Sequence, residues 1–159
     1  MIRRIIMKIK TTATLLTEVD ISEFEISFKI KLPEEYRNFM LEQNGGRPEK
    51  EWGFDFVETG NSNPTGSIIC DFLAISTKYN SLQNAYRNLI ESKEIPPGLL
   101  PIANDPGGNI IFLSVAKDDY GKVCFGNHEL EDPETGYIVM SPIADSFIEF
   151  IDKCYECDE

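Results

Sequence analysis

Hydrophobic residues in the first third of the chain recur at helical spacing in two segments. In residues 17–28, apolar side chains three or four positions apart share one face of a helix, and carboxylates occupy most other positions. A second helix is expected to begin around Pro33 and to end at residues 44–46, where two glycines permit a left-handed closing residue. The side chains expected in the core are Val19, Ile21, Phe24, Phe28, Tyr36, Phe39 and Met40.

The middle of the chain alternates between strand and loop signals. Residues 51–58 place aromatic side chains at every second position, which is typical of a strand with one buried face. Residues 60–67 are rich in Asn, Ser, Pro and Gly and are expected to form a loop, whereas the apolar residues 68–75 are expected to form a strand. Ser81 then caps a helix that ends before residues 95–98, and its apolar face is formed by Leu82, Ala85, Tyr86, Leu89 and Ile90.

Short β-prone runs dominate the second half of the chain. Residues 100–103, 109–115 and 122–126 are separated by turn sequences, so we expect successive antiparallel strands. A polar loop leads to a last strand at residues 137–140. Ser141 and Pro142 then signal a terminal helix, whose apolar positions are Ile143, Phe147, Phe150, Ile151 and Cys154. The pattern predicts the α+β class: a single domain with an antiparallel sheet of about five to six strands packed with helices.

A chain of 159 residues with 42% hydrophobic content fits one domain. We divide it into an N-terminal extension or first strand at residues 1–16, the folded domain at residues 17–155, and an acidic tail at residues 156–159. Met7 would serve equally well as a translation start, which leaves open whether residues 1–6 belong to the native protein.

The charge balance narrows the classes of partner. Fifteen basic against 27 acidic side chains give a net charge of -12, which argues against direct binding to nucleic acid or to an anionic membrane surface and favours a basic partner. The amino terminus has no export signal, and no apolar run reaches the roughly 18 residues that span a bilayer. We therefore expect a cytoplasmic protein without membrane association. The sequence does not define its oligomeric state.

Residues for catalysis or cofactor binding are scarce. His128 is the one histidine, and it lies in an acidic, turn-like segment without a recognisable nucleophile motif. Cys154 and Cys157 have the spacing of half a zinc site, but no second such pair or histidine pair accompanies them. We expect reduced thiols, no metal, no cofactor and no catalytic residue.

Acidic residues are concentrated near the carboxyl terminus. Residues 118–159 hold twelve of them, against Lys122 and Lys153. This surface either serves solubility alone or attracts a cationic partner, and we predict that turns at one side of a sheet bring its charges into one acidic patch. Two tyrosines are the expected anchors. The predicted partner-binding residues are Asp118, Asp119, Tyr120, Glu129, Glu131, Asp132, Glu134 and Tyr137; the alternative surface is residues 47–56 with Trp52.

Four segments, in this order along the chain, resemble the SMI1/KNR4 family, also called the SUKH superfamily. The first is Ile21-Ser22-Glu23-Phe24-Glu25 with the helix opening Leu32-Pro33-Glu34-Glu35-Tyr36-Arg37-Asn38-Phe39. The others are Asn44-Gly45-Gly46-Arg47-Pro48, the stretch from Ile95 to Asn109, and the terminal segment from Ile143 to Ile151. The resemblance extends over residues 17–155 and implies a single α+β domain. It supplies no catalytic motif, because the matching residues are interpreted as caps, turns and core.

What the resemblance implies about function is binding rather than catalysis. Bacterial members are mostly immunity proteins that neutralise a cognate toxin domain, and many of those toxins are nucleases, whose nucleic-acid surface is basic. We therefore expect a basic toxin protein as the partner. The alternative is a regulatory scaffold without catalytic activity, similar to the eukaryotic members that regulate cell-wall synthesis. A ligand-binding domain or a weak enzyme is the third hypothesis.

Overall fold

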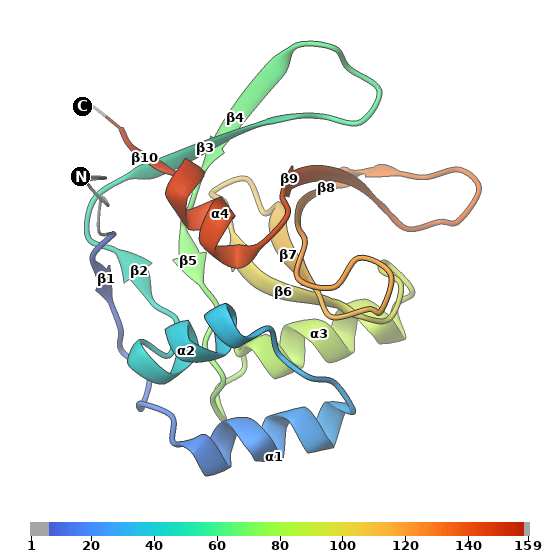
Figure 1. The fold of residues 1–159 in the computed structure, drawn as a ribbon. Helices are drawn as coiled ribbons and strands as arrows, with labels where there is room; N and C mark the ends of the chain where they lie inside the picture. Colours follow the sequence, from blue (N-terminus) through green and yellow to red (C-terminus); the bar gives the residue numbers. More distant parts are fainter. Residues whose placement is uncertain (1–6, 158–159) are drawn as a thin grey trace.

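The largest sheet of the domain has five antiparallel strands. The computed structural model describes residues 7–157. The strands β5 (Asp71–Phe72), β6 (Leu99–Asn104), β7 (Ile110–Ser114), β8 (Val123–Glu131) and β9 (Ile138–Ala144) pair in chain order (Figure 1). Consecutive pairing of this kind produces a meander in which each strand reverses the direction of the previous one. The predicted α+β fold with an antiparallel sheet is confirmed.

Two smaller sheets complete the strand structure of the described residues. The sheet on one side of the core has the order β10 (Tyr155–Glu156), β3 (Trp52–Val57) and β4 (Pro64–Ile68). The other pairs β1 (Ile9–Lys10) with β2 (Arg47–Pro48). Because β10 pairs with β3, the end of the described chain is joined to the first long strand.

Four helices in the described chain pack around the sheets, and three begin at the hydroxyl caps typical of helix starts. Thr17 caps α1 (Glu18–Phe28) in a reciprocal capping box with Asp20, and Ser81 caps α3 (Leu82–Glu91). The second helix, α2 (Glu34–Glu42), follows Pro33, which lies one position before the first turn. The last helix is α4 (Phe147–Lys153). The predicted starts of α1 and α3 are confirmed.

Aromatic side chains fill the space between the two larger sheets. Phe56 of β3 stacks on Phe125 of β8 with 4.3 Å between the ring centroids, and Phe54 meets Phe150 of α4 edge-on at 5.6 Å. All four rings are buried. The predicted period-two pattern of β3 is confirmed, since its aromatic positions face the core and Asp55 is exposed.

Two hairpins project from this core. Figure 1 shows the β3–β4 hairpin and the β8–β9 hairpin extending from the body on the side away from the described chain ends. We call them the β3–β4 arm (residues 53–68) and the β8–β9 arm (residues 127–138). Thr59, in the turn of the β3–β4 arm, joins this arm to β9: its amide donates to Ser141 Oγ at 2.9 Å and its hydroxyl donates to the Met140 carbonyl at 2.7 Å.

The expected loop at residues 60–67 is partly wrong, because β4 begins within it at Pro64. Proline and glycine favour loops, but β4 lies at the edge of its sheet, where a missing amide donor is tolerated. Its pairing with β3 runs from Gly53 opposite Ile68 to Val57 opposite Pro64. The strand expected at residues 68–75 is correspondingly reduced to Asp71–Phe72.

The predicted start of the terminal helix is also wrong. The last strand of the large sheet, β9, continues past residue 140 through Ser141 and Pro142 to Ala144, and α4 begins only after Ser146, whose hydroxyl accepts a hydrogen bond from the Glu149 amide. Proline is compatible with β9 because this strand is the edge of the five-stranded sheet. A serine-proline pair is therefore an ambiguous signal at a sheet edge.

Gly45 and Gly46 have a different role from the predicted helix cap. The helix α2 ends at Glu42, and its closing residue Gln43 is extended rather than left-handed. Gly45 has a φ of 65°, and a Cβ atom there would lie 2.7 Å from the Phe72 carbonyl oxygen. Gly46 bonds through both backbone groups to Phe72 of β5. The two glycines permit close approach of the backbone to β5.

Candidate functional site

The predicted binding residues fall into two groups at opposite ends of β8. Asp118, Asp119 and Tyr120 lie in the turn before this strand. The other five lie on the β8–β9 arm, at the far end of β8 or after it: Glu129, Glu131, Asp132, Glu134 and Tyr137. A strand of nine residues is about 30 Å long. The prediction that all eight residues form one patch is wrong, because consecutive antiparallel hairpins turn at opposite ends of their shared strand.

Two side chains of the turn before β8 form hydrogen bonds within the protein. The Tyr120 hydroxyl donates a hydrogen bond to the Lys31 carbonyl at 2.7 Å, which joins this turn to the connection between α1 and α2. Asp119 accepts a bond from Ser114 Oγ at 2.6 Å. Partial burial, and then the nearby Glu25 charge, raise the pKa of Tyr120 above its ordinary value. Tyr120 is nevertheless 44% exposed.

The β8–β9 arm presents its carboxylates on an ordered backbone. Glu129 and Glu131 lie on β8 itself rather than in the loop expected from the sequence. At the tip, Asp132 Oδ1 accepts hydrogen bonds from the Glu134 and Thr135 amides at 2.8 and 3.3 Å. The Asp132 amide donates to the Tyr137 carbonyl at 2.8 Å. Since these bonds fix the turn, a partner would meet carboxylates that are already positioned.

The β8–β9 arm is a segment without lysine or arginine. The sequence holds no Lys or Arg between Lys122 and Lys153. Within residues 7–157, Glu129, Glu131, Asp132 and Glu134 form no ion pair. Their negative potential is therefore directed to solvent rather than neutralised within the molecule.

The fold adds a carboxylate that sequence reasoning missed. Glu58, where the β3–β4 arm begins to turn, accepts a hydrogen bond from Asn127 Nδ2 of β8 at 3.3 Å. Residues 51–77 also lack Lys and Arg, a signal that could have marked this segment as a second cation-free region. We name this surface the acidic arms, and its residues are Glu58, Glu129, Glu131, Asp132 and Glu134.

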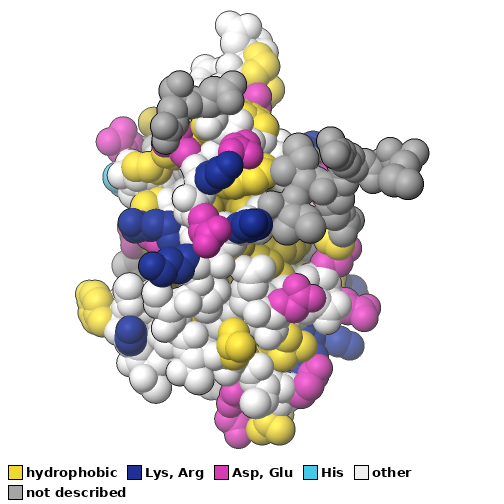
Figure 2. Space-filling model, turned by 90° about the vertical axis from the view of Figure 1, so that its left-hand side faces the viewer, with side chains coloured by type: hydrophobic (Ala, Val, Ile, Leu, Met, Phe, Trp, Pro, Cys, Tyr) yellow, Lys and Arg dark blue, Asp and Glu magenta, His cyan; other side chains and the backbone are white. Residues whose placement is uncertain are grey.

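The opposite face of the molecule differs in charge. Figure 2 views the side of the domain away from the two arms and shows Lys and Arg side chains among Asp and Glu. Lys10 of β1 lies opposite Arg47 of β2, and Arg47 Nε is 3.0 Å from Asp71 Oδ1. Lys50 pairs with Glu156 at 3.0 Å. Charges on this face are partly neutralised, in contrast to the acidic arms.

Asp105 is a carboxylate with a structural role. It is 7% exposed, and its oxygens accept hydrogen bonds from Ser67 Oγ, the Gly107 and Asn109 amides and Asn109 Nδ2 at 2.7 to 3.1 Å. Burial opposes its ionisation, but these bonds outweigh burial and hold the pKa of Asp105 below its usual range. All the bonds serve the β6–β7 turn and its contact with β4.

The remaining candidate chemistry serves the fold. His128 Nε2 lies 2.8 Å from the Gly107 carbonyl oxygen, so the ring holds β8 against the β6–β7 turn. Burial raises the pKa of both Cys124 and Cys154 to about 12, which keeps these thiols protonated and unreactive at neutral pH. Trp52, the centre of the alternative binding surface, is buried at 4% exposure.

Metal sites and membrane spans are absent from the part of the chain that the structure describes. Residues 7–157 contain no group of three or more His, Cys, Asp or Glu side chains placed to hold a metal ion. None of the described helices has the length and apolar character needed to cross a membrane.

Comparison with known proteins identifies the family. The SMI1 / KNR4 family (SUKH-1) model matches residues 15–153. The SPbeta prophage-derived uncharacterized protein YokK of Bacillus subtilis (strain 168) is 28% identical over 148 residues, covering 85% of this chain and 72% of that protein. No solved structure matches the chain. Because the family model extends from α1 to the end of α4, the chain belongs to the SMI1/KNR4 family (SUKH-1).

Proposed function

We propose that this protein is an immunity protein that binds and neutralises a basic toxin domain, and that the acidic arms are its contact surface. The observation that carries the proposal is the set of five carboxylates on two adjoining hairpins, none of them in an ion pair within the described residues. Membership of the SMI1/KNR4 family supports the class of function.

The chemistry favours a nuclease among toxins. An enzyme that acts on nucleic acid needs a cationic surface for phosphate groups, and an acidic protein with the same charge pattern as that substrate competes for the surface. Unpaired carboxylates on rigid hairpins steer such a partner from a distance and reduce the rearrangement needed on contact. Binding by occlusion requires no catalytic residue of the inhibitor.

Leu130 and Tyr137 are the candidate anchors of this contact. Leu130 lies between Glu129 and Glu131 on β8 and is 40% exposed. Tyr137 precedes β9 and is half-buried. Aromatic and aliphatic groups at the centre of an interface usually contribute more binding energy than charges at its rim. We therefore assign affinity to the anchors and association rate to the carboxylates.

The first experiment tests neutralisation. The toxin candidate encoded beside this gene is expressed with and without the protein, and we expect growth arrest that the protein relieves. If it relieves no neighbouring toxin, the proposal fails. Binding to a cellular protein that is not a toxin, without any protection, would instead favour the regulatory scaffold.

The second experiment tests the surface and uses a matched pair of variants. One variant carries Glu58→Lys, Glu129→Lys, Glu131→Lys and Glu134→Lys; Asp132 is kept because its side chain holds the turn. The control carries Glu42→Lys, Glu49→Lys, Glu51→Lys and Glu91→Lys, four exposed positions in other parts of the described chain. Both variants change the net charge by the same amount.

Association with the toxin is measured at low and high ionic strength. At low salt we expect the arm variant to associate about 10- to 100-fold more slowly, the control to change by less than about threefold, and the difference to shrink at high salt. Equal slowing of both variants would mean that net charge alone governs association. That result would remove the assignment of the contact to the arms while leaving the immunity function intact.

A further inference from the structure

A hollow of about 380 Å³ lies between α2 and α4 and has an apolar wall. Its wall includes Phe39 of α2 and Phe147, Ile148 and Ile151 of α4. Phe147 is buried, Phe39 and Ile151 are half-buried, and Ile148 is 37% exposed. The described residues therefore leave part of this apolar surface open.

The outer face of α1 is also apolar. Val19 is 64% exposed and Ile26 is 77% exposed, so the expectation that Val19 belongs to the core is wrong. The hollow between α2 and α4 differs from that face, because the chain itself contains a segment whose chemistry matches it.

The charges around the hollow are all negative. Glu35, Glu42 and Asp152 line it, and the described residues of its lining include no Lys or Arg. Within residues 7–157, Glu35 and Glu42 form no ion pair. An occupant that is both apolar and cationic would complement this surface.

A hydrogen-bond acceptor in the hollow lacks a donor. Gln43 follows α2 and lines the hollow, and its Oε1 is buried without a hydrogen-bond partner in the described chain. A buried amide oxygen without a donor is unfavourable, and backbone amides and guanidinium groups are suitable donors. A peptide segment that contains arginine would offer both.

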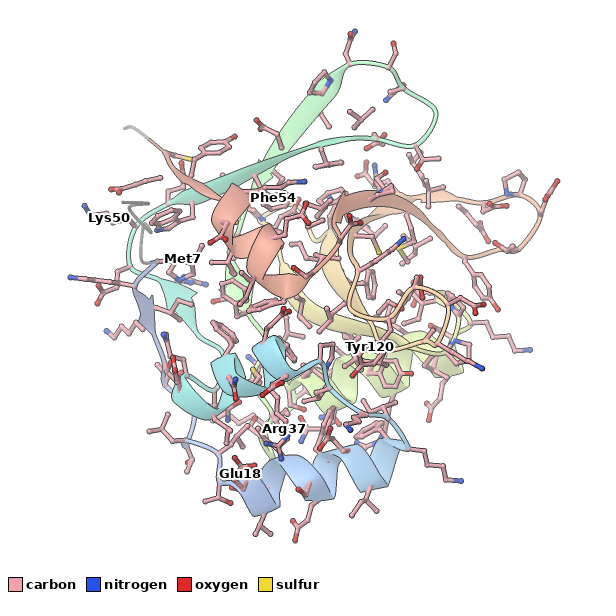
Figure 3. The ribbon with its side chains drawn as sticks, in the orientation of Figure 1. Met7, Glu18, Arg37, Lys50, Phe54 and Tyr120 are labelled. Atoms are coloured by element: carbon pink, nitrogen blue, oxygen red, sulfur yellow. The ribbon has the colours of Figure 1, made fainter. Side chains whose placement is uncertain are left out.

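The described chain begins at this hollow. Met7 is 6% exposed and lines it. Figure 3 shows Met7 at the start of β1, beside α4. The next residues are held against β2, since the Glu49 amide donates to the Lys8 carbonyl at 2.9 Å and Ile9 lies opposite Pro48. The residue that precedes Met7 is therefore joined to the chain at the hollow itself.

Residues 1–6 lie outside the described part of the chain, but their sequence matches the hollow. They read Met-Ile-Arg-Arg-Ile-Ile, with three isoleucines and two arginines. Six residues span at most about 20 Å, which is sufficient for Arg3 and Arg4 to meet the carboxylates. Apolar surface, charge and point of attachment thus indicate the same occupant.

We propose that residues 1–6 of this chain occupy the hollow, with isoleucines against its apolar wall and Arg3 and Arg4 toward Glu35 and Glu42. Because the segment is joined to Met7, its local concentration at the hollow exceeds that of a separate peptide. A separate ligand would need the same combination of branched aliphatic and arginine side chains, and it would have to displace the segment. The hollow does not include the acidic arms, so this proposal does not depend on the toxin.

Thermal melts of the full chain test the charge match. Arg3→Glu with Arg4→Glu should lower the melting temperature by about 3 °C. The matched control is Lys78→Glu with Lys117→Glu, two exposed positions elsewhere that change the net charge by the same amount. The control should lower the melting temperature by less than about 1 °C. Equal losses in both variants would show that net charge alone acts, and would overturn the proposal.

A charge swap separates contact from a general effect. Glu35→Lys should lower the melting temperature in the wild type, because it removes a partner of the arginines. In the background of Arg3→Glu with Arg4→Glu, the same change should recover at least half of the loss, because it restores opposite charges. An identical effect of Glu35→Lys in both backgrounds would mean that the segment does not meet this carboxylate.

Thiol protection tests the apolar part of the contact. Ile2→Ser with Ile5→Ser should raise the maleimide reactivity of Ile148→Cys about fivefold and leave that of Ile26→Cys on α1 unchanged, because release of the segment uncovers the hollow alone. Peptide mapping separates these thiols from Cys70, Cys124, Cys154 and Cys157. Unchanged reactivity of Ile148→Cys overturns the proposal. Reactivity that falls as the protein concentration rises would assign the hollow to a second copy and overturn it as well.

Discussion

Two turns of the five-stranded sheet are each closed by an aspartate side chain that accepts backbone hydrogen bonds, but the two aspartates have different roles. In the β6–β7 turn, Asp105 Oδ1 accepts bonds from backbone amides two and four residues later, and in the β8–β9 turn, Asp132 Oδ1 accepts bonds from amides two and three residues later. Asp105 also binds Ser67 of β4 and is buried, whereas the Asp132 turn projects into solvent. A turn motif therefore predicts a local backbone shape, and the surrounding structure decides whether its charge stabilises the fold or faces a partner.

The largest expected difference between the two turns is in stability. Asp105→Ala removes the acceptor of four hydrogen bonds and leaves their donors partly buried, so we expect a loss of about 3 kcal/mol in the free energy of unfolding. Asp132→Ala should cost less than about 1 kcal/mol, because water replaces its bonds. Urea denaturation of both variants measures the contrast, and equal losses would show that burial is not what separates the turns.

The pH dependence of stability sharpens the same contrast. The folded-state pKa of Asp105 lies below the unfolded value of 3.8, so its stabilisation is fully present above the unfolded pKa and is lost as the pH falls through the folded pKa. Wild type should therefore be more stable than Asp105→Asn near pH 6, and the gap should narrow as the pH falls below about 4. Thermal melts across this range measure it; a constant gap would exclude ionisation of Asp105 as its cause.

A smaller effect is expected at the contact that joins β8 to the β6–β7 turn. His128→Ala removes the bond between Nε2 and the Gly107 carbonyl, and we expect a loss of about 1 kcal/mol. Hydrogen exchange should speed up for the amides of the β6–β7 turn and not for those of the β8–β9 tip. Faster exchange at the tip alone would show that His128 supports the arm rather than the turn.

The smallest effect on stability is expected at the arm carboxylates. Glu129→Gln, Glu131→Gln and Glu134→Gln together should leave the free energy of unfolding unchanged or raise it by up to about 0.5 kcal/mol at low salt, because like charges repel in the folded arm. The measurement is denaturation at two ionic strengths. A loss above about 1 kcal/mol would mean that these carboxylates have structural partners and are not available for recognition.

Local sequence signals allowed several helices and strands to be predicted. The elements that were missed depend on pairing with a strand distant in sequence. Ser81 marked the start of α3 because a capping side chain bonds to an amide three residues away, and the spacing of apolar side chains located α1. Strand β4 and the second half of β9 were missed because a partner strand, and not local preference, holds Pro64 and Pro142 in extended backbone.

The candidate site, too, could be predicted from the sequence only in part. The carboxylates of the β8–β9 arm could be predicted because they are close in sequence. Glu58 could not, since its approach to Asn127 depends on how two hairpins 69 residues apart pack. The prediction that Asp118 lies beside this group was wrong. It did not take into account that strand direction reverses along the meander, which places successive turns at opposite ends of β8.

The sequence by itself determined the class of fold, the family resemblance, the excess of acid and the absence of cations along two segments. Those properties follow from residue types and short-range spacing. Only the tertiary structure decided that Trp52 is buried, that Val19 and Ile26 face outward, and that Asp105 is consumed by hydrogen bonds while the arm carboxylates remain free of ion pairs in the described chain. The physical reason is that exposure and pairing depend on contacts between segments distant in sequence, which no local pattern encodes.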